Sequence, residues 1–474
     1  MARPRFFRDP IHGQIRFNRL VLDSDFSGID PGNAEDQIGW LLPNLINCKA
    51  FQRLRHVRQN GLTNLVFHGM EHSRFSHSMG VSFLACQMYE RIVRNSSLEQ
   101  DPQRQLAVAT ASLLHDIGHG PFSHTIEEAL NDSHPEKRKW FNHEVMTSRI
   151  LTEDEEINGK LRAVSDTFPS YVAAYIDRSQ RPEDHWTYRL ISSQLDADRL
   201  DYLMRDTKQA GLQTHGFDLY RLLDMLFFWK GRVVVDRHAT EAVEAYLLTL
   251  EHVYKTIYFH HGVRGASVLL GSILKRAFVL HQEGDASVFS DSNGGPTNPL
   301  RALMEKGEAM EIGEYIRLGE FHVWHLVENW QYSRDAILSD LSRRLMQRQR
   351  FRSMEYEPGY MSKFMSECEG RIAKLVCDKL PFTITKEDAL MYYVLVDDPK
   401  RVGYKTYNWG VSEGKTYLKD DAIWLFSSGG REPVPIEQEN ENGIFNALKK
   451  INHFHRFVFP HEVLEGVKAL PYFS

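Results

Sequence analysis

EHSRFSHSMGV at residues 71–81 opens the part of the chain that decides the fold. SLLHDIGHGPFSH follows at 112–124, and LDADRLDYLMRD comes at 195–206. These stretches place four candidate metal ligands in segments that are otherwise rich in apolar residues: His77, His115, Asp116 and Asp198. Two imidazoles with two carboxylates suit a divalent transition cation better than calcium or a thiolate-bound zinc. The sequence therefore predicts a metal centre.

Helical periodicity explains how these polar groups meet. Apolar residues recur at helical spacing in 79–93, 104–117 and 188–206, which predicts three amphipathic helices. His77 lies just before the first helix, and the His-Asp pair ends the second, before a Gly- and Pro-rich stop. A single His-Asp pair is more often a hydrogen-bonded core feature than a ligand pair. Ionisable groups on three helices instead indicate a compensating cation, because an unpaired buried carboxylate is costly.

The order H…HD…D in these stretches resembles the HD-domain phosphohydrolase superfamily. DPIHG at 9–13 and FQRLRHVRQNG at 51–61 resemble its deoxynucleoside triphosphate triphosphohydrolase (dNTPase) branch, including the catalytic core of a human enzyme with a sterile alpha motif and its bacterial relatives. The five blocks span most of 5–265. The resemblance implies a mainly α fold, with an HD-domain helical core and a smaller α+β C-terminal region. It also implies a homo-oligomer, either a dimer or a tetramer.

A second set of polar residues suits proton transfer. His124 and Glu127 lie three residues apart. An imidazole that a carboxylate orients is a suitable general acid or base near neutral pH. Taken singly, His124 or His143 fits a surface or capping role equally well. The resemblance implies that His119 and His143 join this pair in the catalytic set, with His119 offsetting charge on the phosphate oxygens.

Substrate contacts are expected from several further side chains. Arg74 precedes His77 by one helical turn and can hold a phosphate through two parallel hydrogen bonds. The resemblance implies the others: Gln59 at the deoxyribose, Arg199 at a phosphate, Tyr202 at the 2′ carbon, Asp206 at a ribose hydroxyl and Tyr258 along the nucleoside pocket. The bulk of the tyrosine at the 2′ carbon disfavours a 2′-hydroxyl. Leu250 stands where the human enzyme has an arginine on the terminal phosphate, which leaves the number of substrate phosphates open.

The N-terminal part carries features of a regulatory site. Residues 5–18 are predicted to form a strand, a turn and a second strand. The resemblance places this block near an oligomer interface and an activating-nucleotide site, with Gln52 and Arg55 on the regulated surface. Asn47 stands where the human enzyme has an aspartate that reads guanine, and its uncharged amide argues against guanine-triggered activation. Residues 22–44 are predicted to form an inserted surface loop.

Composition sets the broad class of the protein. The chain has 474 residues, of which 42% are hydrophobic and 25% charged, as in ordinary globular proteins. A net charge of −6 makes nucleic acid an unexpected partner. Four scattered cysteines form neither a disulfide framework nor a zinc ribbon. No signal-like or membrane-length apolar segment is present, so a cytoplasmic protein without membrane contact is expected.

Changes in composition along the sequence predict a domain, a linker and a C-terminal region. Residues 1–282 form the metal-dependent phosphohydrolase domain, 283–299 a Gly-, Ser- and Pro-rich linker, and 300–474 an associated α+β region. Residues 300–355 are expected to be helical. After residue 380, β-like runs occur at 381–385, 389–396, 406–411 and 422–426. No Gly-rich phosphate loop of the Walker or Rossmann kind is found, so phosphate recognition must come from side-chain cations and the metal.

These features lead to three hypotheses. The first is hydrolysis of deoxynucleoside triphosphates at the α-phosphorus, with a bound Mn, Mg, Fe, Ni or Zn ion and with a nucleotide effector implied by the resemblance. The second is an HD phosphohydrolase acting on another nucleotide, such as an alarmone, a modified or cyclic nucleotide, or a nucleoside monophosphate. The third is a binding module with a vestigial site, which the complete ligand set argues against. Spacing and composition alone support a metal-assisted phosphohydrolase.

Overall fold

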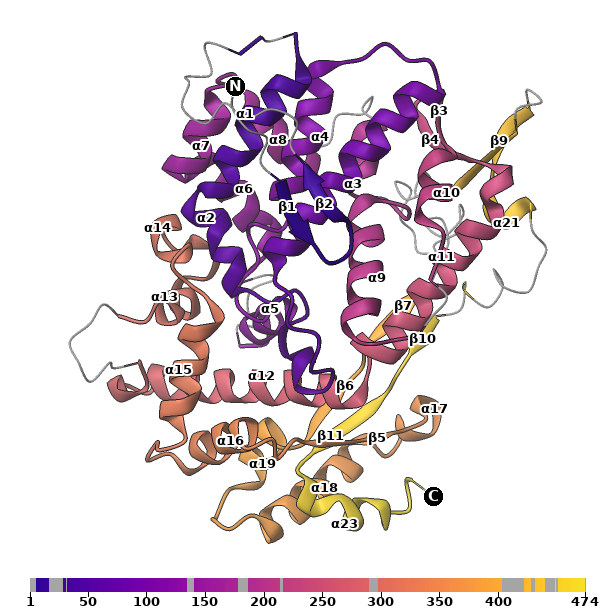
Figure 1. The fold of residues 1–474 in the computed structure, drawn as a ribbon. Coiled ribbons are helices and arrows are strands. Elements are labelled where there is room, and N and C mark those ends of the chain that lie inside the picture. The colour runs from indigo at the N-terminus through magenta and orange to yellow at the C-terminus, as the bar shows by residue number, and fades with distance from the viewer. Residues whose placement is uncertain are drawn as a thin grey trace.

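The computed structural model describes residues 6–16, 29–30, 32–133, 140–177, 186–213, 216–289, 297–402, 422–427, 431–439, 448 and 451–473. Figure 1 shows helices in most of this part of the chain, with short strands near the N-terminus and toward the C-terminus. The predicted mainly α fold with a smaller α+β region is confirmed.

Three helices surround the predicted metal ligands. α3 (Arg74–Asn95) packs against both α4 (Pro102–Leu114) and α9 (Ala197–Gln209). Asp101 caps α4 and Asp196 caps α9, because each side chain accepts a hydrogen bond from a backbone N–H in the first turn. The His-Asp pair at the end of α4 and the first turn of α9 therefore lie in fixed positions beside α3 (Figure 1).

The predicted boundaries of these helices hold only in part. The first helix extends beyond 79–93 at both ends, and the second ends at Leu114 instead of residue 117. The prediction of a continuous helix over 188–206 is wrong at its start. A 3-10 turn, η4 (Trp186–Leu190), comes first, and α9 begins only after Asp196, whose cap to Arg199 N sets the first turn.

Other helices surround this centre or follow it along the chain. They are α1 (Ala34–Asn47), α2 (Lys49–Gln52), α5 (His124–Asp132), α6 (His143–Glu153), α7 (Glu155–Arg162), α8 (Phe168–Ile176), α10 (Leu219–Asp224), α11 (Thr240–Val253), α12 (His261–Gln282), α13 (Pro299–Lys306), α14 (Ile312–Tyr315), α15 (Glu320–Trp330), α16 (Ala336–Met346), α17 (Pro358–Met361), α18 (Met365–Lys379), α19 (Lys386–Tyr392), α21 (Ile436–Glu439) and α23 (Leu464–Lys468). Short 3-10 or π turns are η2 (Arg53–His56), η3 (Gly61–Leu65), η5 (Arg237–Ala239), η6 (Tyr254–Tyr258), η7 (Ala286–Phe289), η8 (Gly307–Ala309) and η10 (His461–Val463).

The strands of the described chain form four small sheets. The strands are β1 (Phe6–Asp9), β2 (Gly13–Arg16), β3 (Leu226–Trp229), β4 (Arg232–Asp236), β5 (Arg352–Glu355), β6 (Leu395–Asp397), β7 (Lys400–Val402), β8 (Trp424–Ser427), β9 (Arg431–Pro435), β10 (Ile451–His453) and β11 (Arg456–Phe459). β1 and β2 form the predicted N-terminal hairpin, with Phe6 opposite Arg16 and Asp9 opposite Gly13. The other sheets have the orders β3-β4-β8-β9, β5-β11-β6 and β10-β7.

The C-terminal strand predictions were partly wrong. Residues 381–385 form no strand, and the first half of 389–396 belongs to α19, while its last two residues begin β6. The reason is local, because the Thr385 side chain caps α19 by accepting from Asp388 N. The run at 422–426 contains most of β8, whereas 406–411 lies outside the described residues. The end of the expected helical span 300–355 is strand β5.

Part of the expected surface loop is a buried helix. Within 22–44, residues 34–44 belong to α1, while 22–28 and 31 lie outside the described residues. Asn33 caps α1 by accepting from Asp36 N, and apolar residues such as Leu41 and Leu42 are completely buried. The polar composition before α1 concealed this apolar face. The linker expected at 283–299 contains η7, and the predicted division into domains stays a prediction.

None of the described helices combines the length with the apolar character that crossing a bilayer requires.

The crossing of α3 and α9 depends on a glycine. A Cβ atom at Gly80 would lie 1.9 Å from Asp201 Oδ1 and 2.6 Å from Arg205 Nη2. These two side chains are completely buried and hydrogen-bonded to each other, so neither can move aside without leaving a buried charge unpaired. Close approach of the two helices thus requires the absence of a side chain at this position.

We expect Gly80→Ala to lower the free energy of unfolding by about 3 kcal/mol or more, because the added methyl group overpacks the crossing. Urea denaturation followed by circular dichroism measures this change. The matched control is Gly159→Ala in α7, where an added Cβ meets no atom within 4 Å. That control should stabilise the protein by about 0.5–1 kcal/mol. Equal effects of the two substitutions would contradict the role assigned to the crossing.

Candidate active site

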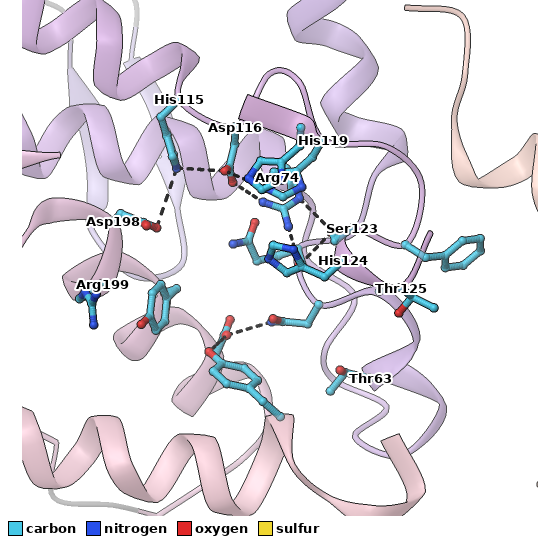
Figure 2. A pocket seen from close by; sticks show the side chains of 18 of the residues that line it. Thr63, Arg74, His115, Asp116, His119, Ser123, His124, Thr125, Asp198 and Arg199 are labelled. Carbon is cyan, nitrogen blue, oxygen red and sulfur yellow. Dashed lines mark hydrogen bonds and ion pairs between the residues drawn. The ribbon is translucent and has the colours of Figure 1, made fainter. Parts of the chain in front are cut away.

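The four predicted metal ligands lie together where α3, α4 and α9 meet. His77 Nε2 is 3.0 Å from Asp198 Oδ1 and 3.7 Å from Asp116 Oδ2. His115 Nε2 is 3.4 Å from Asp116 Oδ1 and 3.8 Å from Asp198 Oδ1. Figure 2 shows His115, Asp116 and Asp198 pointing toward one another at the wall of a cavity. The structure therefore brings all four side chains to one point.

Both histidines are oriented as metal ligands require. The Nδ1–H of His115 donates to Ser112 O (2.8 Å), and its buried Nε2 has no hydrogen-bond partner among the described residues. His77 Nδ1 is 2.7 Å from Asp201 Oδ2. With Nδ1 of each ring engaged, the Nε2 atoms face the two carboxylates. This donor set fits a divalent transition cation without selecting one metal.

Charges around the carboxylates keep them ionised. Burial alone would raise the pKa of Asp116, but the positive charge of Arg74, aided by His115 and His119, holds that pKa well below its ordinary value. Burial also opposes ionisation of Asp198, and its hydrogen bond with His77 lowers its pKa. In the metal-free protein the site thus presents two anionic oxygen ligands.

Arg74 is committed to protein partners on several sides. Its side chain is buried and its Nη1 donates to Asp116 Oδ2. Its Nε donates to Ser123 Oγ at 3.0 Å, and its Nη2 reaches Gln59 O at 3.3 Å. The guanidinium still lines the cavity. It therefore positions the carboxylate of a predicted metal ligand.

A glycine brings α6 close to the His-Asp pair. A Cβ atom at Gly118 would lie 2.2 Å from His143 O and 2.3 Å from Thr147 N. Gly118 N instead donates to Thr147 Oγ1 at 3.0 Å. This contact places the ring of His143 against that of His119, with 3.8 Å between ring centroids and 14° between ring planes. A motif residue of the loop thereby positions a histidine from a separate helix.

The turn before His124 is strained. Phe122 and Ser123 have φ values of 55° and 54°, in the left-handed region that non-glycine residues rarely occupy. Such residues cost about 1–3 kcal/mol each and persist only where their surroundings fix them. Phe122 is buried, and Ser123 Oγ donates to Arg58 O at 3.1 Å while accepting from Arg74. The strained turn aims the first residue of α5 toward the cavity (Figure 2).

The histidine set shares one carboxylate. Glu127 Oε2 is 2.7 Å from His143 Nδ1 and 3.7 Å from His124 Nδ1. Burial would raise the pKa of Glu127, but hydrogen bonds with both histidines lower that pKa to about 2. Burial and the charge of Arg74 hold the pKa of His119 well below its ordinary value. An anionic carboxylate thus sits beside two imidazoles, with a neutral third imidazole next to them.

The opposite end of the cavity contains a second buried carboxylate. Asp206 is completely buried, and its Oδ2 accepts from Tyr258 OH and, at 2.9 Å, from Asn60 Nδ2. Asp206 Oδ1 lies 2.8 Å from His72 Nε2. The rings of Tyr202 and Tyr258 meet edge to face, with 6.3 Å between their centroids. The predicted nucleoside contacts therefore form one wall.

Sequence reasoning missed three residues of the site: Asn60, His72 and Ser123. All three lie inside motifs already quoted, so only their position in the motifs could have drawn attention to them. Their roles depend on contacts across more than sixty residues or on backbone conformation, which no local pattern encodes.

The cavity has a volume of about 760 Å³. All the predicted catalytic and substrate residues except Glu127 line this cavity, and Glu127 contacts His143 in the lining. Arg199 and Tyr202 belong to α9. The buried Oε1 of Gln59 has no hydrogen-bond partner among the described residues. Leu250 is buried in the core and does not line the cavity, whereas Arg264 of α12 does. The lining therefore includes an arginine from α12, and none from the position of Leu250.

The predicted regulatory residues lie apart from this cavity. Asn47 lines a separate hollow of about 540 Å³ formed by residues of α1 and α7, including Lys160. Arg55 Nε donates to Gln52 Oε1 at 2.8 Å, and its guanidinium lies 3.6 Å from the centroid of the Phe75 ring. Their role in regulation stays a prediction.

Comparison with known sequences identifies related proteins. The family described as HD domain matches residues 74–206. The uncharacterized protein YwfO of Bacillus subtilis is 32% identical over 470 residues, which cover 99% of this chain and 95% of that protein. The deoxynucleoside triphosphate triphosphohydrolase SAMHD1 homolog of Dictyostelium discoideum is 34% identical over 266 residues, 54% of this chain and 46% of that protein. The chain thus spans less than half of this last relative.

A solved structure shows the same fold. The phosphohydrolase from Bacteroides thetaiotaomicron superposes with a TM-score of 0.75 over 97% of this chain and 100% of that chain. The two sequences are 22% identical, so this likeness speaks for the fold alone.

The metal site can be tested at Asp198, which is the most exposed of the four side chains at 35%. We expect Asp198→Ala to remove stoichiometric Mn²⁺ binding, because it deletes one of two carboxylate ligands while the protein stays folded. Elemental analysis after dialysis measures the bound metal, and circular dichroism checks folding. His124→Ala, outside the ligand set, should retain the metal. Equal metal content in both variants would place the metal elsewhere.

Proposed function

This chain belongs to the HD-domain family, and we propose that it hydrolyses deoxynucleoside triphosphates to deoxynucleoside and inorganic triphosphate with a bound divalent cation. One observation carries the proposal: a single cavity is lined by three of the four predicted metal ligands, His115, Asp116 and Asp198, by the histidines around Glu127 and by the wall formed by Tyr202, Asp206 and Tyr258. The fourth ligand, His77, lies directly behind this lining, with its Nε2 3.0 Å from Asp198 Oδ1. The fold and family support a metal-dependent hydrolase. The activity printed for the Dictyostelium relative supports this substrate class.

The metal end of the cavity would activate the phosphate. A divalent cation held by His77, His115, Asp116 and Asp198 supplies Lewis acidity and lowers the pKa of water. Arg74 keeps Asp116 ionised and fixed in place. Arg74 and His119 both line the cavity, where their N–H groups offset negative charge that builds on phosphate oxygens. The protein thereby stabilises the transition state with groups that are already oriented.

The histidine set would move the proton. His124 lies at the cavity edge and donates its proton to the leaving oxygen. Glu127 is ionised and places a negative charge 3.7 Å from His124 Nδ1. His143 hydrogen-bonds with the same carboxylate and so holds it in place.

The nucleoside end would select the sugar. Burial, together with the nearby carboxylate of Asp206, holds the pKa of Tyr258 well above its ordinary value, so the phenol stays a neutral donor. The unpartnered Oε1 of Gln59 is available to a sugar hydroxyl. The ring of Tyr202 fills space at this wall, which disfavours a 2′-hydroxyl through steric exclusion.

A second candidate is an HD phosphohydrolase acting on another nucleotide. The observation that favours it is the buried Leu250, which stands where the resemblance places a terminal-phosphate arginine and is not among the described residues that line the cavity. Arg264 supplies a cation in the cavity lining, but it already pairs with Asp397. Homo-oligomer formation and nucleotide activation at Asn47 also stay predictions.

Product identity tests the proposed reaction. Purified protein with Mn²⁺ should convert a dNTP to deoxynucleoside and triphosphate, and should act about tenfold or more slowly on the matching NTP, because the extra hydroxyl meets Tyr202. Ion-exchange chromatography measures the products. His124→Asn should lower kcat by about 10²–10⁴-fold with little change in KM. Release of phosphate or pyrophosphate, or turnover of alarmones alone, would favour the second candidate.

The pH profile tests the role of Glu127. Because its pKa is about 2, its charge is constant across the working range and it contributes no limb itself. Glu127→Gln removes the charge that stabilises the protonated general acid, so the high-pH limb of the kcat profile should move to lower pH by about 1 unit. Steady-state kinetics between pH 5 and about 10 measure the shift. Glu144→Gln, an exposed cavity neighbour, should leave the limb in place, and equal shifts would contradict the assignment.

A further inference from the structure

The N-terminal hairpin lies outside residues 74–206, the part that matches the HD domain. β2 packs against α3, and Figure 1 shows the hairpin beside the centre of the molecule. His12 lies in its turn, and only 2% of its side chain is exposed. A histidine buried at a turn calls for a specific partner, because an unpaired buried polar group is costly.

That partner is a carboxylate beneath the metal site. His12 Nε2 is 2.6 Å from Asp201 Oδ1, and His77 Nδ1 is 2.7 Å from Asp201 Oδ2. Asp201 is completely buried and lies three residues after Asp198 in α9, so the two carboxylates are about one helical turn apart. The ring of the hairpin histidine and the ring of a metal ligand therefore share one carboxylate, one on each oxygen.

Arg205 completes the link between the hairpin and α9. It donates to both oxygens of Asp201, at 2.8 Å and 2.9 Å, and its Nη1 donates to Asp9 Oδ2 at 3.0 Å. Asp9 Oδ1 in turn accepts from the backbone N–H groups of Ile11 and His12 at 2.8 Å and 3.0 Å. The turn is thus fixed at both its backbone and its histidine side chain.

We propose that His12 and Asp201 are positioning residues for the metal ligand His77. Asp201 accepts the Nδ1–H of His77, which leaves Nε2 to face Asp116 and Asp198, and it holds the ring plane in place. His12 acts one step further out by fixing Oδ1 of Asp201, the oxygen that does not face His77. The hairpin is therefore part of the metal centre, although it supplies no ligand. This inference rests on the metal site of the proposed function and not on its substrate.

A purely structural role predicts a different result from a positioning role. If His12 only fastened the hairpin, its loss would lower thermal stability and leave the metal affinity of the folded protein unchanged. If it positions His77, its loss must weaken metal binding at temperatures where the protein is fully folded. Metal affinity of the folded apoprotein is the quantity that separates the two.

The test is titration of the chelator-stripped full chain with Mn²⁺ by isothermal calorimetry, well below the Tm of each variant. Asp201→Asn should weaken Mn²⁺ binding about 10–100-fold, as outer-sphere partners of metal ligands do, and His12→Ala about 10-fold. His12→Gln retains an N–H donor and should recover most of the affinity. Gln14→Ala, exposed on the same hairpin, should bind as the wild type does.

The outcomes are distinct from those of the proposed function. Wild-type affinity in His12→Ala, or equal losses in His12→Ala and Gln14→Ala, would overturn the positioning role. Absence of rescue by His12→Gln alongside a loss in His12→Ala would also count against it. Failure of the wild type to bind Mn²⁺ would instead overturn the metal site itself. If His12→Ala does not fold, the Mn²⁺ affinities of His12→Gln and Asp201→Asn are compared instead. Weaker binding in Asp201→Asn than in His12→Gln supports the positioning role, and wild-type affinity in both overturns it.

Discussion

The structure depends on the neutralisation of buried carboxylates where α3 crosses α9. Asp116 and Asp198 face the cavity, and the completely buried Asp201 lies behind them. Taking such charges out of water costs several kcal/mol each unless each has a partner. Arg74 and Arg205 provide these partners, one on the cavity side and one on the hairpin side. Helix packing, hairpin docking and ligand orientation are therefore consequences of the same charge balance.

This arrangement also explains where the molecule is strained. The turn at Phe122 and Ser123 has an unfavourable backbone conformation, yet Ser123 accepts from the arginine that holds Asp116. The strain and the metal site thus share one hydrogen-bond network. The turn starts α5 at His124, so the distance between the predicted metal ligands and His124 is set by the same contacts. Pre-organisation of this kind is typical of strained segments at functional sites.

The sequence predicted those parts of the site that short motifs encode. Periodicity located the helices, and the motif stretches contained all four facing ligands. The motifs and the periodicity did not show local capping or contacts between distant residues. Asp196 set the start of α9 by capping, which periodicity over 188–206 could not show. Asn60 and His72 join Asp206 through tertiary contacts, and His12 meets Asp201 across 189 residues. The apolar face of α1 was hidden because a polar stretch precedes it.

The charge of the cavity finally explains why the metal matters for an anionic substrate. Among the described residues that line it, the arginines are Arg74, Arg199 and Arg264, and no lysine is present. Arg74 is paired with Asp116, Arg199 lies 3.6 Å from Asp196, and Arg264 lies 2.7 Å from Asp397 in β6, so each of the three charges already has a carboxylate partner. The cavity also carries acidic side chains, including Glu128 and Glu144. A polyphosphate entering it would meet little net positive charge from the protein, and a divalent cation is then needed to offset the repulsion as well as to activate the reaction. In the proposed reaction, metal binding and substrate binding are therefore coupled through the same electrostatic balance that holds α3 and α9 together.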